Sequence, residues 1–197
     1  WIEQVTNKAD AEAALCRAYN KWMGDIWRRS NGRLRWTCVT PVLMMDEAIQ
    51  QIRDAKENGA VGVCLRPFEG DKFLIHSYFY PIFEEAERLD MPIAVHIANA
   101  SPFYRSLFES VFENAASFNL FRVPTMMACH GLIGSEIPQL FPKLRWAFIE
   151  ASAMWMPWIW NEVAQRFLMM RSISDKDRSM PEDLFRSYNI FVTCQTD

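Results

Sequence analysis

Two apolar segments of the sequence end in side chains of types that can bind metals. Residues 91–98 read Met-Pro-Ile-Ala-Val-His-Ile-Ala and place His96 near the end of a strand-like run. Residues 144–150 read Leu-Arg-Trp-Ala-Phe-Ile-Glu and end in Glu150. A neutral imidazole is a good ligand for zinc, iron or manganese, and a carboxylate beside it favours iron or manganese, although zinc accepts the same pair. We therefore predict that His96 and Glu150 are metal ligands in one site, with Glu150 also a candidate for acid or base catalysis.

Both residues have simpler interpretations as well. A carboxylate that ends an apolar run is costly to bury unless it is paired, hydrogen-bonded or bound to a metal. Glu150 could therefore form a salt bridge with a strand-end arginine such as Arg66. His96 could be a core histidine that is hydrogen-bonded to a main-chain carbonyl.

Other side chains near these strand ends are candidates for substrate binding. Arg66 ends a strand and could hold a substrate carboxylate in a bidentate pair, or form a structural ion pair. Asn99 follows the first of the two strands and could line the site. Trp155 follows the second strand and, with Met156, could wall a pocket for an aromatic or hydrophobic acid, although core packing is the usual role of such residues.

The two remaining histidines are less directly placed. His130 lies between the two strands in a helical context, and it is a candidate catalytic residue if its helix reaches the site. His76 lies in a polar connection beside Ser77, where a solvated role is expected.

A scaffold must bring these strand ends together. Apolar residues at helical spacing predict helices over 9–29, 46–58, 80–89, 102–118, 125–140 and 157–170, with a loop over 172–179. Short apolar runs predict strands over 34–39, 60–65, up to His96, up to Glu150 and over 190–194. In the first helix the apolar positions define the face that we expect to be buried, namely Ala14, Leu15, Ala18, Trp22 and Ile26.

Strands that alternate with helices predict an α/β fold with a parallel sheet covered by helices. The sequence contains neither GxGxxG nor GxxxxGK[ST], which argues against a nucleotide-binding open sheet. Polar groups recur at the carboxyl ends of the strands, where (β/α)8 TIM barrels gather their chemistry. These groups are Thr40, Arg66, His96, Glu150 and Gln195. We therefore expect residues 1–197 to be an internal part of a single TIM-barrel domain, holding five of the eight strands, with the first strands and the last strand outside it.

The composition limits the classes of partner. The chain has 197 residues, 50% of them hydrophobic, and a net charge of -3 from well-mixed charged residues. It lacks the basic stripe that nucleic-acid binding requires and any apolar run near the ~20 residues that cross a bilayer. We expect a small-molecule substrate, no nucleic-acid or membrane partner, and a cytoplasmic location. Barrels of this type often pair, so a homodimer is compatible with the sequence.

The five cysteines do not form a recognisable framework. They show no CxxC spacing and are odd in number, so we expect buried, reduced thiols rather than disulfides or a metal site. They are Cys16, Cys38, Cys64, Cys129 and Cys194.

Several segments together resemble a known family. They are 92–96 (Pro-Ile-Ala-Val-His), 141–145 (Phe-Pro-Lys-Leu-Arg) and 148–157 (Phe-Ile-Glu-Ala-Ser-Ala-Met-Trp-Met-Pro), with further likeness at 15–22 and 62–67. This pattern resembles the amidohydrolase-related family, the metal-dependent barrel group that includes aminocarboxymuconate semialdehyde decarboxylase and gamma-resorcylate decarboxylase. The resemblance covers nearly all of the chain.

The resemblance implies that His96 is the metal-binding histidine of the family's fifth barrel strand. The family's decarboxylases end their sixth strand in His-Gly-Gly-Gly, whereas the matching residues here are Glu150-Ala-Ser-Ala. This replacement is similar to a Glu-centred pattern in other members, and it weighs against decarboxylation. The family's early ligand pair and its eighth-strand aspartate would fall outside this sequence.

These inferences lead to three functional hypotheses. The first is a hydrolase or decarboxylase that uses a divalent metal (zinc, manganese or iron) and acts on a small organic acid, aromatic or hydrophobic in character. The second is a non-haem di-iron oxygenase on the same barrel, because carboxylates bridge iron pairs readily. The third is a metal-free barrel that serves as a binding or scaffold protein.

Overall fold

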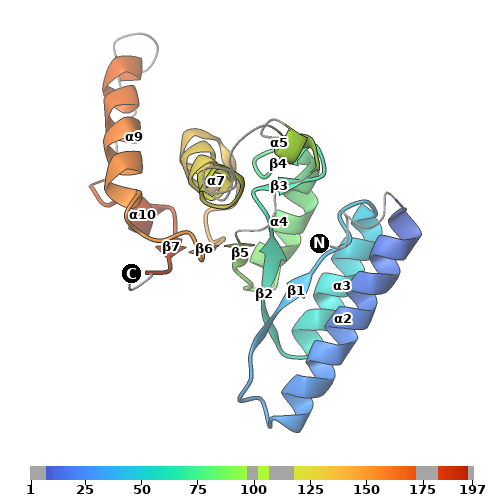
Figure 1. The fold of residues 1–197 in the computed structure, drawn as a ribbon. Coiled ribbons are helices and arrows are strands. Elements are labelled where there is room, and N and C mark those ends of the chain that lie inside the picture. Colours follow the sequence, from blue (N-terminus) through green and yellow to red (C-terminus); the bar gives the residue numbers. More distant parts are fainter. Residues whose placement is uncertain (1–7, 97–101, 107–117, 172–181, 195–197) are drawn as a thin grey trace.

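The computed structural model describes residues 8–96, 102–106, 118–171 and 182–194, and the statements below refer to these residues (Figure 1). Five strands form one parallel sheet, and two short strands form a separate antiparallel hairpin. The strands of the sheet are β1 (Trp36–Val39), β2 (Ala60–Leu65), β5 (Ile93–His96), β6 (Trp146–Ile149) and β7 (Ile190–Val192). The hairpin consists of β3 (Phe68–Glu69) and β4 (Lys72–Phe73).

The helices largely match the predicted ones. They are α2 (Ala9–Arg29), α3 (Met45–Glu57), η1 (Ser77–Phe79), α4 (Tyr80–Arg88), α5 (Pro102–Ser106), η2 (Phe118–Arg122), α7 (Val123–Gly134), α8 (Ile137–Leu140), α9 (Met156–Arg171) and α10 (Leu184–Ser187). The predicted helix over 125–140 is two helices, because Ser135 between them is extended, with φ -98° and ψ 176°. Part of the predicted helix over 102–118 and the predicted loop over 172–179 lie outside the described residues.

The strand order confirms the expected fold class. The strands neighbour one another as β1-β2-β5-β6-β7, which is their order along the chain, and every pairing is parallel. A doubly wound open sheet reverses its strand order at a switch point. An order without reversal is that of a (β/α)8 barrel, of which the described residues form five strands.

The two faces of the sheet differ in how well they are covered. Successive side chains of a strand point to opposite faces. On one face the side chains are buried under helices, and Trp146 of β6 packs edge-on against Phe83 of α4 with ring centroids 5.0 Å apart. On the other face the residues are mostly half-buried or exposed, including Thr37, Val39, Cys64, His96, Ala147, Ile149 and Phe191. This second face corresponds to the interior of a barrel.

Helix α2 buries a different face from the predicted one. Leu15 and Trp22 are 44% and 57% exposed, whereas the buried residues are Glu12, Ala13, Cys16, Asn20 and Gly24. The reason is that hydrogen bonds of a polar side chain, rather than apolar contacts, determine which face of α2 packs. The side-chain amide of Asn20 donates to the Val39 carbonyl and to Gln51 and accepts from the Val39 N–H, which fixes α2 on β1 and α3. The apolar spacing identified the helix correctly but not its packed face.

Glycine stops α3 as predicted. Gly59 has a φ of +87°, and a Cβ atom there would lie 2.2 Å from the indole ring of Trp27 on α2. Only glycine allows both the left-handed turn into β2 and this close approach.

The prediction of buried thiols is correct for three cysteines, partly correct for Cys64 and wrong for Cys194. All five thiols are free, and Cys16, Cys38 and Cys129 are buried while Cys64 is partly buried. Cys194 is exposed, because β7 ends at Val192 and Cys194 lies beyond the strand. No helix among the described residues is long and apolar enough to span a bilayer.

Candidate metal centre

His96 and Glu150 meet at the carboxyl ends of two neighbouring strands. His96 is the last residue of β5 and is paired in register with Ile149 of β6, so Glu150 follows immediately. The Nε2 atom of His96 lies 3.0 Å from Oε2 of Glu150, and the two side chains are 43% and 52% exposed. The sheet thus brings together the two residues that sequence analysis selected, and it leaves them accessible to a ligand.

The backbone at Glu150 is in an unusual conformation. Glu150 has a φ of +65° and Ser152 a φ of +61°, in the left-handed region that side chains other than glycine rarely adopt. The N–H of Glu150 donates to Oγ1 of Thr193, the residue after β7, at 2.9 Å. Such a conformation persists only where the surrounding structure holds it in place, and it is frequent at functional sites.

Trp155 has a structural role in this turn. Its indole Nε1 donates to the Ala151 carbonyl at 2.9 Å, and its ring packs edge-on against Phe148 of β6, with centroids 6.2 Å apart. Trp155 is only 7% exposed. The role of its side chain in substrate binding stays a prediction, whereas its contact with the turn is a feature of the fold.

The donor set fits a divalent metal. Two ligands that bind one metal at about 2.1 Å and at right angles have donor atoms about 3.0 Å apart. The separation between Nε2 of His96 and Oε2 of Glu150 matches that value. An imidazole nitrogen together with a carboxylate oxygen suits zinc, manganese or iron.

The described residues supply two donors to this centre. No group of three or more His, Cys, Asp or Glu side chains that could hold a metal occurs among residues 8–96, 102–106, 118–171 and 182–194. In this part of the chain the candidate centre therefore consists of His96 and Glu150.

Arg66 is held by a buried carboxylate at the end of the neighbouring strand β2. Glu69 of the hairpin accepts hydrogen bonds from the Arg66 main-chain N–H at 2.8 Å, from Nε at 3.1 Å and from Nη2. The two side chains are 13% and 7% exposed. The structural ion pair considered for Arg66 is thus present, and its partner is Glu69.

Glu12 of α2 adds a second carboxylate near this pair. Burial raises the pKa of Glu12, and the negative charge of Glu69 raises it further. The hydrogen bond that Glu12 accepts from the Leu43 N–H at 2.8 Å lowers this pKa, as does the positive charge of Arg66. The charge of Arg66 thus acts on both buried carboxylates, and its hydrogen bonds to Glu69 fix its guanidinium group.

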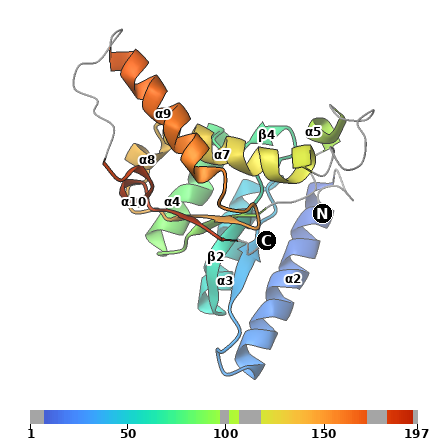
Figure 2. The same cartoon turned by 60° about the vertical axis from the view of Figure 1, so that its left-hand side comes forward.

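The other candidates are placed less decisively. His130 is half-buried on α7, a helix that lies beyond the carboxyl end of β2 together with the hairpin (Figures 1 and 2). A Cβ atom on its neighbour Gly131 would lie 3.0 Å from the Phe73 ring of the hairpin. Asn99 and Gln195 lie outside the described residues. His76 is exposed, and its Nδ1 accepts the Tyr78 N–H at 3.0 Å.

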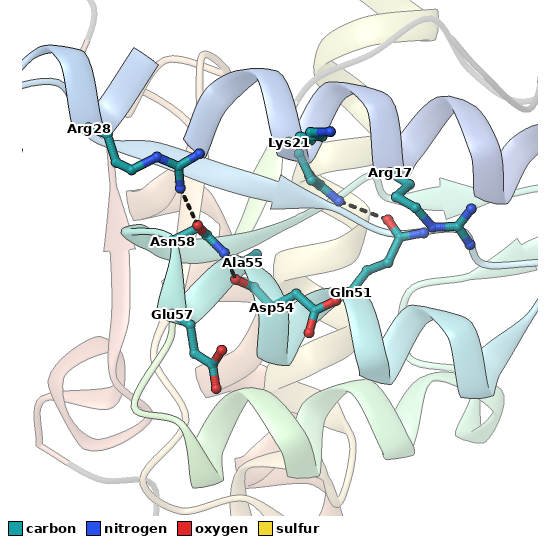
Figure 3. Close-up of a pocket in the computed structure, with 9 residues that line it drawn as sticks. Arg17, Lys21, Arg28, Gln51, Asp54, Ala55, Glu57 and Asn58 are labelled. Atoms are coloured by element: carbon teal, nitrogen blue, oxygen red, sulfur yellow. Dashed lines mark hydrogen bonds between the residues drawn. The ribbon is translucent and has the colours of Figure 1, made fainter. Parts of the chain in front are cut away.

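A separate polar pocket lies between α2 and α3 (Figure 3). Its side chains bond to one another across the two helices: Arg28 donates to Asn58, and Asn20 donates to Gln51. Barrel enzymes carry their chemistry at the carboxyl ends of the strands, whereas this pocket follows the outer helices. We therefore interpret the pocket as part of the helix packing.

A comparison with protein families identifies the chain. The family model described as Amidohydrolase matches residues 2–179. The chain belongs to the amidohydrolase family. Among curated proteins, none matches the sequence of this amidohydrolase. Membership confirms the resemblance noted in the sequence.

Solved structures of the family share the fold. The amidohydrolase is similar to 5-carboxyvanillate decarboxylase from Sphingomonas paucimobilis, with a TM-score of 0.77 and 17% identity over 97% of this chain and 57% of that chain. The 5-carboxyvanillate decarboxylase from Novosphingobium aromaticivorans was solved with manganese and 3-methoxy-4-hydroxy-5-nitrobenzoic acid. It gives a TM-score of 0.79 and 20% identity over 96% of this chain and 55% of that chain. The 2,6-dihydroxybenzoate decarboxylase from Rhizobium gives a TM-score of 0.68 and 15% identity over 97% of this chain and 61% of that chain. The chain thus spans a little more than half the length of these TIM-barrel structures.

Sequence analysis did not select Thr193 or Glu69. Thr193 directly follows an apolar strand, as Glu150 does, and this position was the available signal. The sequence pattern, however, predicted that the strand would end at Cys194 rather than at Val192. Glu69 precedes the Gly70-Asp71 turn of a hairpin whose turn residues are visible in the sequence.

Proposed function

We propose that this amidohydrolase is a metal-dependent enzyme in which His96 and Glu150 hold part of a divalent metal site, and that it hydrolyses or decarboxylates a small organic acid. The observation that carries the proposal is the 3.0 Å approach of Nε2 of His96 to Oε2 of Glu150 at adjacent strand ends. When bound, such a metal polarises a carbonyl group or lowers the pKa of bound water. Manganese in the Novosphingobium structure supports the same choice of ion.

The residues around the pair have separable tasks. His96 would present a neutral imidazole, and Glu150 would present a carboxylate that can bind the metal or accept a proton. Arg66, fixed by Glu69, would bind a substrate carboxylate, and His130 and Asn99 remain candidates for proton transfer and for lining the site. Decarboxylases solved with aromatic acids support an aromatic acid as the substrate class.

Elemental analysis tests the proposal. The protein purified without added metal, together with its His96→Ala and Glu150→Ala variants, would be analysed for zinc, manganese and iron. We expect near-stoichiometric metal in the parent. Each variant should contain much less metal, because removal of one ligand should weaken the affinity for metal at least about tenfold. His76→Ala is the matched control, because this exposed histidine caps η1 and should leave the metal content unchanged.

The same measurement separates the alternatives. Two irons per chain with oxygen consumption would favour the di-iron oxygenase. Absence of metal in the parent, and no uptake on reconstitution, would favour the metal-free scaffold and contradict the proposal.

A further inference from the structure

The hydrogen-bond ladder between β6 and β7 changes at Glu150. The Trp146 N–H donates to the Asn189 carbonyl at 2.9 Å, and the Thr193 N–H donates to the Phe148 carbonyl at 3.1 Å. In a parallel ladder that continued with this spacing, the Glu150 N–H would donate to the main-chain carbonyl of Thr193. It donates instead to the Thr193 hydroxyl oxygen at 2.9 Å.

A side chain thus replaces a main-chain acceptor where the strand turns away. A threonine hydroxyl can accept one hydrogen bond and donate another. Oγ1 of Thr193 accepts from the Glu150 N–H and lies 3.5 Å from the Phe148 carbonyl, to which it donates. One hydroxyl group therefore spans the last carbonyl of the ladder and the first N–H of the turn.

The turn is fixed on its other side as well. The Trp155 indole donates to the carbonyl of Ala151, the residue after Glu150. The N–H of Glu150 is bonded to Thr193, which follows β7, and the Ala151 carbonyl, one peptide group further on, is bonded to Trp155, which precedes α9, so the turn is held on both sides of Glu150. These two contacts flank the left-handed conformation at Glu150, which has a φ of +65°.

We propose that Thr193 is a positioning residue, which holds the backbone of Glu150 so that its carboxylate meets the His96 imidazole and is ready to bind metal. This inference rests on the proposed function, because it concerns the same pair. Thr193 contacts Glu150 through the main-chain N–H of Glu150. Its effect on the metal is therefore indirect, in the manner of residues that orient metal ligands from outside the coordination sphere.

Replacing Thr193 by valine tests the role of the hydroxyl. Thr193→Val keeps the branched shape and removes the acceptor, while Thr193→Ser keeps the acceptor. Thr193 is exposed, so neither change disturbs the core. Calorimetric titration with manganese(II) chloride should show a Kd about tenfold weaker for Thr193→Val and within about twofold of the parent for Thr193→Ser. Thr37→Val, the same change on β1 at the opposite edge of the sheet, should leave the Kd unchanged.

Thermal unfolding separates positioning from general destabilisation. We expect the Tm of Thr193→Val to stay within about 4 °C of the parent, because the Glu150 N–H can be hydrated at this exposed position. A parent-like Kd in Thr193→Val, or an equal loss in Thr193→Ser, would overturn the positioning role while a loss in His96→Ala still supported the metal site. A parent-like Kd in His96→Ala would instead overturn the proposed function.

Discussion

At the scale of single residues, Glu150 combines a candidate metal-binding position with a backbone conformation that is costly for a residue with a side chain. A residue other than glycine in the left-handed region is less stable by roughly 1–2 kcal/mol than in the right-handed one. The φ of +65° places Glu150 there, and its carboxylate lies 3.0 Å from the His96 imidazole. The sequence resemblance implies that the family's decarboxylases have a histidine at the position of Glu150 and glycines after it. This chain has Ala151 and Ser152 after Glu150. The geometry of the turn thus depends on its contacts rather than on glycine.

Two substitutions at Glu150 separate the cost of its conformation from its function. Glu150→Gly and Glu150→Ala both remove the carboxylate, so both should lose metal to the same extent. Glycine adopts the left-handed region freely, so Glu150→Gly should be more stable than Glu150→Ala by roughly 1 kcal/mol in urea unfolding. Equal stability of the two variants would show that the residue at this position is not left-handed in solution.

At the scale of elements, an ion-pair cluster on the helical layer joins α3 to α4. Glu85 of α4 accepts hydrogen bonds from Arg88 of the same helix and from Arg53 of α3. The Glu85 side chain is 7% exposed. The hydrogen bonds from Arg88 make the largest contribution to lowering the pKa of Glu85, and Arg53 adds to it. Burial acts in the opposite direction, and the resulting pKa is about 2. This carboxylate stabilises the packing of helices that cover the sheet.

The pKa of Glu85 predicts an acid-dependent loss of stability. Because its pKa is lower in the folded state, its contribution is complete above about pH 4.5 and is lost as the pH falls toward about 2. Glu85→Gln should lower the free energy of unfolding at pH 7 by about 2 kcal/mol, allowing for the exposure of both arginines. Urea unfolding between pH 2 and 7 checks this expectation.

The control for this prediction is an exposed carboxylate on the same helix. Glu84→Gln should change stability by less than about 0.5 kcal/mol and keep the pH dependence of the parent. If Glu85→Gln kept that pH dependence too, another carboxylate would have to account for it.

At the scale of the whole molecule, the one-sided cover of the sheet determines which groups meet solvent. Cys38 lies on the helix-covered face and Cys64 on the opposite face, and Cys194 lies beyond the last strand. Burial raises the pKa of the Cys38 and Cys129 thiols, of Cys16 to about 12 and of Cys64 to about 11. Thiols with raised pKa values and little exposure are inert.

Thiol labelling therefore reports on the fold as a whole. In the native protein at pH 8, Ellman's reagent should modify Cys194 first, Cys64 more slowly, and Cys16, Cys38 and Cys129 only on unfolding. Cys194→Ser should remove the fast phase, and all five thiols should react in guanidinium chloride. Rapid labelling of Cys38 in the folded state would contradict the packing of helices on that face.

The sequence by itself determined the fold class, the order of the elements and the two metal-ligand candidates. Hydrophobic spacing distinguishes helices from strands locally, and a polar residue at the end of an apolar run marks the end of a strand. Because parallel strands present the same end at one edge of the sheet, His96 and Glu150 could be assigned to one site before their separation was known.

Only the tertiary structure decided which surfaces pack and what holds the site. The packed face of α2 follows from the bonds of Asn20 to β1 and α3, which are formed by polar groups that hydrophobic spacing does not detect. The partner of Arg66 is Glu69 because a hairpin folds back over the strand end. The support of Glu150 by Thr193 joins residues 43 positions apart. Such contacts depend on how elements pack and pair in three dimensions, which the local sequence pattern does not determine.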